Sequence, residues 1–185
     1  MKNPFPRERR LALGWCCSLL LVTLAFAPLG CKRKKSVVQS AGEPPTMAST
    51  VHMGDPQTAT QLINGFYGIE QSAWRWTARR FSLVLRPPFG AGQKGGTLQV
   101  RLTVPSVVVE KLKTISLSAT IGGSTLPPET YTQAGDYTYT RDVAPALLAG
   151  ESVRVDFQLD KSMPPSGADL RELGVVVLSA GIELK

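Results

Sequence analysis

Three aromatic side chains near residue 70 are candidates for contact with a ligand. Trp74 and Trp76 are two positions apart, so in an extended chain they share one face, opposite Arg75. An exposed tryptophan ring is a good platform for the C–H face of a sugar ring, although packing in a core is its commoner use. Tyr67 precedes the pair. Both a core role and a ligand-binding role stay open for these rings.

A second aromatic strip lies further along the chain. Tyr137 and Tyr139 share one face of a predicted strand, opposite Thr138 and Thr140. Such a strip is typical either of cross-strand packing or of a second sugar-binding surface.

Four charged residues accompany the first aromatic group. Glu70 can pair with Arg75 or with Arg171, and Asp169 can pair with Arg171, because an arginine fork matches a carboxylate in a bidentate way. We expect these pairs to pin a loop against the last strand. Binding of a ligand is the alternative role.

The residue types needed for catalysis are scarce. The chain has one histidine, His52, and three cysteines, so no Ser/His/Asp set is expected in the folded part. We find no H-E-x-x-H, C-x-x-C or glycine-rich phosphate motif. The sequence therefore predicts neither an enzyme, nor a metal site, nor a cofactor.

The positive charge lies at one end of the chain. The formal net charge is +7, but residues 36–185 hold 13 basic and 13 acidic side chains. Nucleic-acid binding needs cations clustered on the folded surface. We therefore expect no nucleic-acid partner.

The N-terminal segment predicts export and contact with a membrane. Basic residues up to position 10 precede 19 uncharged residues, 11–29, which is the pattern of a signal peptide and also long enough to span a bilayer. Cleavage after Ala27 is hindered by Pro28. Lipoprotein processing before Cys31 and an uncleaved anchor are the other two outcomes, and Gly30-Cys31 matches the end of a bacterial lipobox, although Pro28 departs from it.

The cysteines favour the lipoprotein outcome. Cys16 and Cys17 lie in the apolar run and would leave with it, so Cys31 would be the single cysteine of the mature chain and needs a role other than an internal disulfide. Lipidation supplies that role. We therefore predict a membrane-anchored protein of the bacterial cell envelope. Lys32 favours the outer membrane, and an inner-membrane signal anchor is the alternative.

The chain divides into three predicted parts: a lipoprotein-type signal peptide (1–30), a linker (31–56) rich in small, polar and proline residues, and a folded domain (57–185). Apolar and polar residues alternate in the folded domain around 81–85, 98–104, 115–121 and 153–159. Residues 174–184 form a buried strand or a hairpin that turns at Ala180-Gly181. Short helical turns are expected at 61–66, 145–148 and 168–173. This pattern predicts an all-β antiparallel sandwich of jelly-roll or immunoglobulin-like type.

Two of these segments carry a family resemblance. An early glutamate followed by Arg-Trp and a late Asp-x-Arg-x-Leu-Gly make residues 62–185 resemble a β-sandwich module of bacterial envelope proteins, found behind signal peptides or fused to glycosyltransferases and polysaccharide-related proteins. The matching residues are Tyr67, Glu70, Arg75, Trp76, Asp169, Arg171, Leu173 and Gly174. The resemblance implies a β-sandwich and, where a role has been supposed for this family, carbohydrate binding.

The sequence thus predicts a membrane-tethered, non-catalytic binding module whose ligand is a glycan or another envelope component. The alternative is a structural or assembly protein that docks another envelope protein through a sheet face or edge. An exposed tryptophan pair at a loop rim favours the first hypothesis. A buried pair together with an uncovered strand edge favours the second.

Overall fold

The computed structural model describes residues 47–185. The predicted signal peptide, Cys31 and residues 32–46 of the predicted linker lie outside the described residues. Within the described part, no helix is both long and apolar enough to cross a bilayer.

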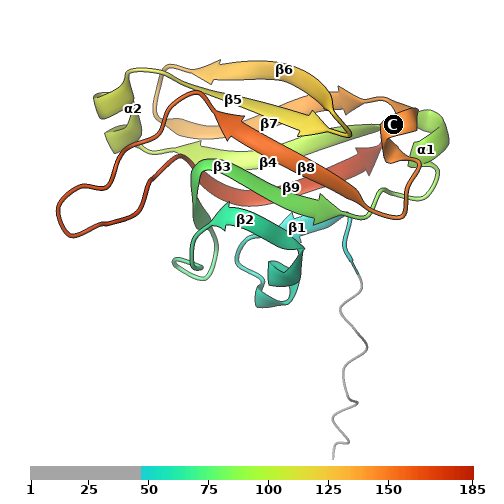
Figure 1. Cartoon of the computed structure of the whole chain (residues 1–185), viewed down its shortest axis with the longest axis horizontal. Helices are drawn as coiled ribbons and strands as arrows, with labels where there is room; N and C mark the ends of the chain where they lie inside the picture. The colour runs from blue at the N-terminus through green and yellow to red at the C-terminus, as the bar shows by residue number, and fades with distance from the viewer. Residues whose placement is uncertain (1–46) are drawn as a thin grey trace, which may run out of the picture. The chain divides into compact units, whose positions relative to one another are not determined.

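The described residues form nine strands and four short helices (Figure 1). The strands are β1 (Thr50–His52), β2 (Leu62–Phe66), β3 (Arg75–Leu85), β4 (Gly96–Val104), β5 (Ile115–Ile121), β6 (Ser124–Tyr131), β7 (Gly135–Val143), β8 (Val153–Leu159) and β9 (Val176–Leu184). The helices are the 3-10 turns η1 (Pro56–Gln61) and η2 (Pro145–Leu148), and the α-helices α1 (Ala91–Lys94) and α2 (Ser106–Leu112).

The strands pair in two antiparallel layers, and the predicted antiparallel β-sandwich is confirmed. One layer has the order β7-β4-β9 and continues with β1 and the start of β3, while the other has the order β6-β5-β8-β3-β2. Strand β3 belongs to both layers. Its first residues, Arg75 and Trp76, pair with β9, whereas Arg80–Leu85 pair with β8. The crossing of β3 therefore joins the two layers at one end of the sandwich.

The core lies between the layers and follows from the alternation in the sequence. In β4, β5 and β8 every second side chain is buried along the whole strand. Phe81 of β3 stacks on Phe157 of β8, with ring centroids 4.8 Å apart. Burial of one such large apolar side chain contributes about 1.5–3 kcal/mol, so these inward rows supply most of the drive to fold.

The folded domain begins earlier than the predicted boundary at residue 57. Residues 50–52 form β1, which pairs with β9, and Val51 and Met53 are fully buried. His52 therefore lies in a strand, where its side chain is exposed. A strand of three residues is too short to show a period of two, so only its pairing with a distant strand reveals it. The linker prediction is corrected for residues 47–56.

Two of the three predicted helical turns are wrong, and one is confirmed. Residues 62–66 form strand β2 instead of a helical turn, and 168–173 form isolated bridges without a helix, whereas the turn at 145–148 is confirmed. Residues 176–184 form one continuous strand. Gly181 does not turn the chain: a Cβ there would collide with Thr50, so glycine lets β1 approach β9.

Candidate functional site

The two motif segments meet because β3 and β9 pair at their first residues. Arg75 lies opposite Val177 and Trp76 lies opposite Val176 in this antiparallel pair, so the segment before β9 continues along β3. Gly174 N donates to Thr77 O over 2.7 Å. A Cβ on Gly174 would lie 2.8 Å from Thr77 Oγ1 and 3.0 Å from Ala78 O, so only glycine fits at this contact.

Arg171 is the centre of the charged cluster. Its Nε and Nη2 donate to the two carboxylate oxygens of Asp169 over 3.0 and 2.9 Å, and its Nη1 donates to Glu70 Oε1 over 2.9 Å. About a third of each side chain remains exposed. The predicted pairing of Arg171 with both carboxylates is confirmed. Arg75 does not pair with Glu70; it donates to the backbone oxygens of Met53 and Tyr67.

Hydrogen bonds within the cluster shift the pKa values of Asp169 and Arg171 so that both groups stay charged. Hydrogen bonds from the Arg171 side chain, and then from its backbone N–H, lower the pKa of Asp169 from 3.8 to about 2. Hydrogen bonds to Asp169 and then to Glu70 raise the pKa of Arg171 further above its ordinary value. The guanidinium and the Asp169 carboxylate therefore stay ionised across the physiological pH range.

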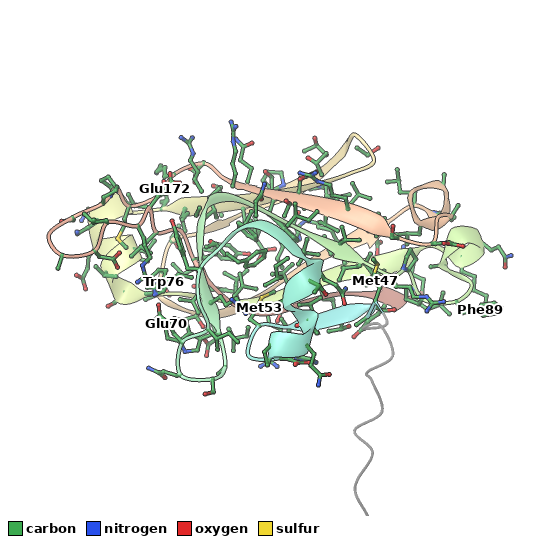
Figure 2. All side chains as sticks on the ribbon, turned by 60° about the horizontal axis from the view of Figure 1, so that its bottom comes forward. Met47, Met53, Glu70, Trp76, Phe89 and Glu172 are labelled. Carbon is green, nitrogen blue, oxygen red and sulfur yellow. The ribbon has the colours of Figure 1, made fainter. Side chains whose placement is uncertain are left out.

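The aromatic residues form a partly exposed group beside this network. Trp76 packs against the core, and Trp74 meets it edge to face at 6.4 Å between ring centroids. Both tryptophans are partly buried. The ring of Tyr67 lies under the Arg171 guanidinium at 5.3 Å, and its hydroxyl donates to Glu172 O over 2.7 Å. The structure thus brings predicted residues of the two segments together at one end of the sandwich, where Figure 2 labels Glu70, Trp76 and Glu172.

The predicted tyrosine strip is not part of this group. Tyr139 is fully buried, and its hydroxyl donates to Pro127 O over 2.9 Å. Tyr137 packs against Tyr131 with ring centroids 4.6 Å apart. The structure shows packing as the role of both tyrosines, because they lie on the face of β7 that contacts the core. Tyr139 has no exposed ring face for a sugar.

Sequence reasoning missed Glu172, which lies inside the late motif. Its Oε1 accepts a hydrogen bond from Ser162 Oγ over 2.6 Å, and its Oε2 accepts one from Arg79 N over 3.3 Å. Glu172 therefore ties the loop before β9 to β3. Its place between Arg171 and Leu173 of the motif was the available signal.

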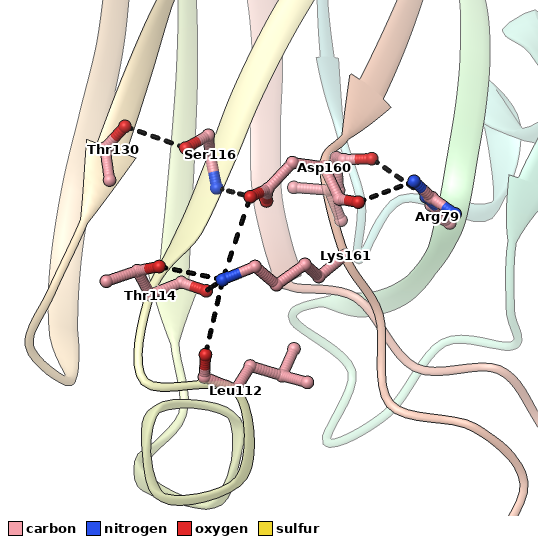
Figure 3. A network of polar contacts seen from close by, with 8 residues as sticks. Arg79, Leu112, Thr114, Ser116, Thr130, Asp160 and Lys161 are labelled. Carbon is pink, nitrogen blue, oxygen red and sulfur yellow. Dashed lines mark hydrogen bonds and ion pairs between the residues drawn. The ribbon is translucent and has the colours of Figure 1, made fainter.

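A separate polar network closes the sandwich near α2 (Figure 3). Asp160 Oδ1 accepts from Ser116 N over 2.7 Å, and Lys161 Nζ donates to Thr114 O over 3.1 Å and to Thr114 Oγ1 over 2.9 Å. Arg79 Nη2 donates to Asp160 O over 2.6 Å. These bonds satisfy backbone groups at the ends of β8 and β5. The network therefore has a structural role.

An open groove of about 900 Å³ lies at the opposite end of the molecule from the tryptophans. Its lining mixes apolar side chains, among them Met47, Phe89 and Leu148, with polar ones, among them Arg86, Gln93 and Glu151. Phe89 is fully exposed. Phe89 directly follows Pro87-Pro88, and an apolar ring after a proline pair was the available signal for this region. Among residues 47–185, no group of three His, Cys, Asp or Glu side chains could hold a metal ion.

Comparison with known proteins gives distant likenesses in structure only. No protein-family model matches the sequence, and no curated protein matches it. A family 35 carbohydrate-binding module from Clostridium thermocellum aligns with a TM-score of 0.39 and 8% identity, over 72% of this chain and 97% of the module. The carbohydrate-binding module CBM36 in complex with calcium and xylotriose aligns with a TM-score of 0.34 and 12% identity, over 78% of this chain and 98% of the module. The CBM36-1 domain of a multidomain xylanase from the hindgut metagenome of Trinervitermes trinervoides aligns with a TM-score of 0.32 and 11% identity. This alignment covers 75% of this chain and 92% of the domain. TM-scores below 0.5 are too low to support an inference about this chain.

Proposed function

We propose that this chain is a non-catalytic, glycan-binding module of the bacterial cell envelope, held at a membrane by a lipid on Cys31. The observation that supports glycan binding is the partly exposed Trp74–Trp76 pair beside the carboxylates that Arg171 holds. The anchor is supported by the sequence alone.

The tryptophan pair has the features of a sugar platform. Trp74 is only partly buried, and the edge-to-face contact with Trp76 fixes the orientation of its ring. Trp76 is fixed in turn by its packing against the core. A ring that is already ordered loses little conformational entropy when a ligand stacks on it. The pair therefore offers a rigid apolar surface at the rim of the loops.

The charged cluster supplies hydrogen-bond acceptors next to that surface. The Glu70 and Asp169 side chains are about a third exposed, and a carboxylate oxygen can accept more than one hydrogen bond. Sugar hydroxyls can donate hydrogen bonds to such acceptors. Because Arg171 orients both carboxylates before a ligand arrives, binding requires little rearrangement.

The alternative, an assembly protein that docks through a sheet edge, finds less support. Strands β6 and β7 each form one edge of a layer, and these two edges lie beside each other. Arg141 of β7 reaches across to β6, donating from Nε to Pro127 O over 2.7 Å and from Nη2 to Pro128 O over 3.0 Å. Side chains and prolines that occupy an edge in this way oppose the addition of another strand.

Glycan binding is tested with the full chain in detergent on an array of bacterial glycans. We expect binding to at least one glycan class and its loss in Trp74→Ala. Trp74→Phe should keep part of the binding because it keeps a ring. The matched control is Ile63→Ala, which removes an exposed apolar side chain outside the site. Absence of binding above background, or equal binding by Trp74→Ala, would refute the proposal.

The anchor is tested by mass spectrometry of the purified protein. A lipid-modified Cys31 at the N-terminus is the expected result. An intact Met1 would establish the uncleaved anchor instead, and a free N-terminus at Pro28 would remove the lipid from the proposal.

A further inference from the structure

The end of the sandwich opposite the tryptophans bears an exposed apolar patch. Phe89 is fully exposed, and Met47 and Leu184 are 36% and 42% exposed. Met47 and Phe89 line the same groove. A Cβ on Gly90 would lie 3.9 Å from Leu184 Cδ1, so Leu184 also adjoins the Phe89 turn. We refer to Met47, Phe89 and Leu184 together as the Phe89 patch.

The turn that presents Phe89 is well ordered by the backbone. Ala91 N donates to Pro88 O over 3.0 Å, and Gly90 has a φ of 86°, which glycine adopts without strain. Arg86 N donates to Ala48 O over 3.1 Å, which ties this turn to the start of the described chain. Two consecutive prolines, Pro87 and Pro88, restrict the loop further. Phe89 is therefore held out from the surface by a rigid turn.

The patch lies where the chain leaves the described domain toward its N-terminus. Cys31 is 16 positions before Met47. A connection of this length spans at most about 55 Å when fully extended. A lipid on Cys31 would thus keep the Phe89 patch close to the bilayer and raise its effective concentration there.

We propose that the Phe89 patch is a second membrane contact, in which Phe89 inserts among the lipid headgroups; this rests on the proposed lipid anchor. A protruding aromatic ring suits the membrane interface, where its apolar body is buried while neighbouring polar groups stay wet. Lys94 and Arg86, both exposed, lie within a few positions of Phe89 and favour an anionic leaflet. One insertion and one tether together orient the module. Because Trp76 and Phe89 lie toward opposite ends (Figure 2), the tryptophans would be directed away from the bilayer.

A ligand bound in the groove is the competing explanation, and the exposure of Phe89 argues against it. A groove ligand is held between walls, whereas the Phe89 ring is fully exposed and projects from the surface. A membrane surface needs a projecting residue of this kind and no enclosing wall.

The test uses the full lipidated chain, labelled with ¹⁵N-glycine, in nanodiscs of phosphatidylcholine and phosphatidylglycerol that contain a lipid with a gadolinium headgroup. Gly90 and Gly92 report on the patch, and Gly68 reports on the opposite end. We expect strong paramagnetic relaxation of the Gly90 and Gly92 amides and weak relaxation at Gly68. Phe89→Ser should markedly reduce this difference, because only the tether then holds the patch near the bilayer, while the protein still copurifies with nanodiscs. The control Val107→Ser, a change at an exposed apolar residue of α2, should leave it intact.

The outcomes separate this inference from the anchor on which it rests. Copurification with equal relaxation at both ends, or an unchanged difference in Phe89→Ser, would overturn the membrane contact and leave the anchor standing. Failure to copurify would overturn both. Glycan-induced shifts at Gly90 and Gly92, without selective relaxation there, would assign the groove to a soluble ligand and also overturn the contact.

Discussion

The two ends of the sandwich present exposed side chains in different ways. At the Trp74 end, the charged groups are joined by hydrogen bonds, as Arg171 is to Glu70 and Asp169, and the rings pack on one another. At the Phe89 end, the ring is fully exposed, and backbone hydrogen bonds hold its turn. Oriented polar groups can select a ligand by its hydroxyls, whereas a bare ring responds to any apolar phase. The first end therefore suits specific recognition, and the second suits contact with a surface.

The largest expected effect comes from breaking the contact that assembles the Trp74 end. Gly174→Ala places a Cβ against Leu159, Thr77 and the backbone oxygen of Ala78. Overpacking of this kind should reduce the free energy of unfolding by about 2–3 kcal/mol, measured by urea denaturation. Gly68→Ala is the matched control at the same end, because nothing lies within 4 Å of its added Cβ. Equal stability of the two variants would show that the β3–β9 contact tolerates a wider spacing.

A smaller effect is expected from removing the charge that orders this end. Arg171→Ala leaves Glu70 and Asp169 without their shared donor, and it should cost about 1 kcal/mol because the pairs are only partly shielded from solvent. Phe89→Ser at the other end should change the free energy of unfolding by less than about 0.5 kcal/mol. Denaturant melts of both variants make the comparison. A larger loss for Phe89→Ser than for Arg171→Ala would reverse the contrast drawn between the ends.

The smallest expected effect is a shift in one titration. The pKa of Asp169 is lowered to about 2, so the stabilisation from its ion pair is present above its ordinary pKa of 3.8 and is lost as the pH falls toward 2. The carboxyl ¹³C resonance of Asp169 should titrate with a midpoint near pH 2. In Arg171→Gln the midpoint should rise toward 3.8, because the cationic donor is gone. A midpoint that is the same in both proteins would contradict the assigned cause.

Much of the fold could be predicted from the sequence because strand alternation is a local property. The inward rows of β4, β5 and β8 follow from the spacing of their apolar residues, without knowledge of their partners. The same holds for Trp74 and Trp76, whose separation by two positions places them on one face, as their ring contact confirms. The sequence also restricted the partners of Arg171 to carboxylates.

Only the tertiary structure decided which of these possibilities is realised. Glu70 pairs with Arg171 and not with Arg75. This outcome depends on the pairing of β3 with β9, whose residues lie about a hundred positions apart in the sequence. Strand β1 exists because β9 offers it a partner, and Tyr139 is buried because β7 turns that face inward. The full exposure of Phe89 likewise depends on how its turn leaves the domain. Each of these outcomes arises from contacts between distant segments, and a local pattern holds no information about which distant segment will be the neighbour.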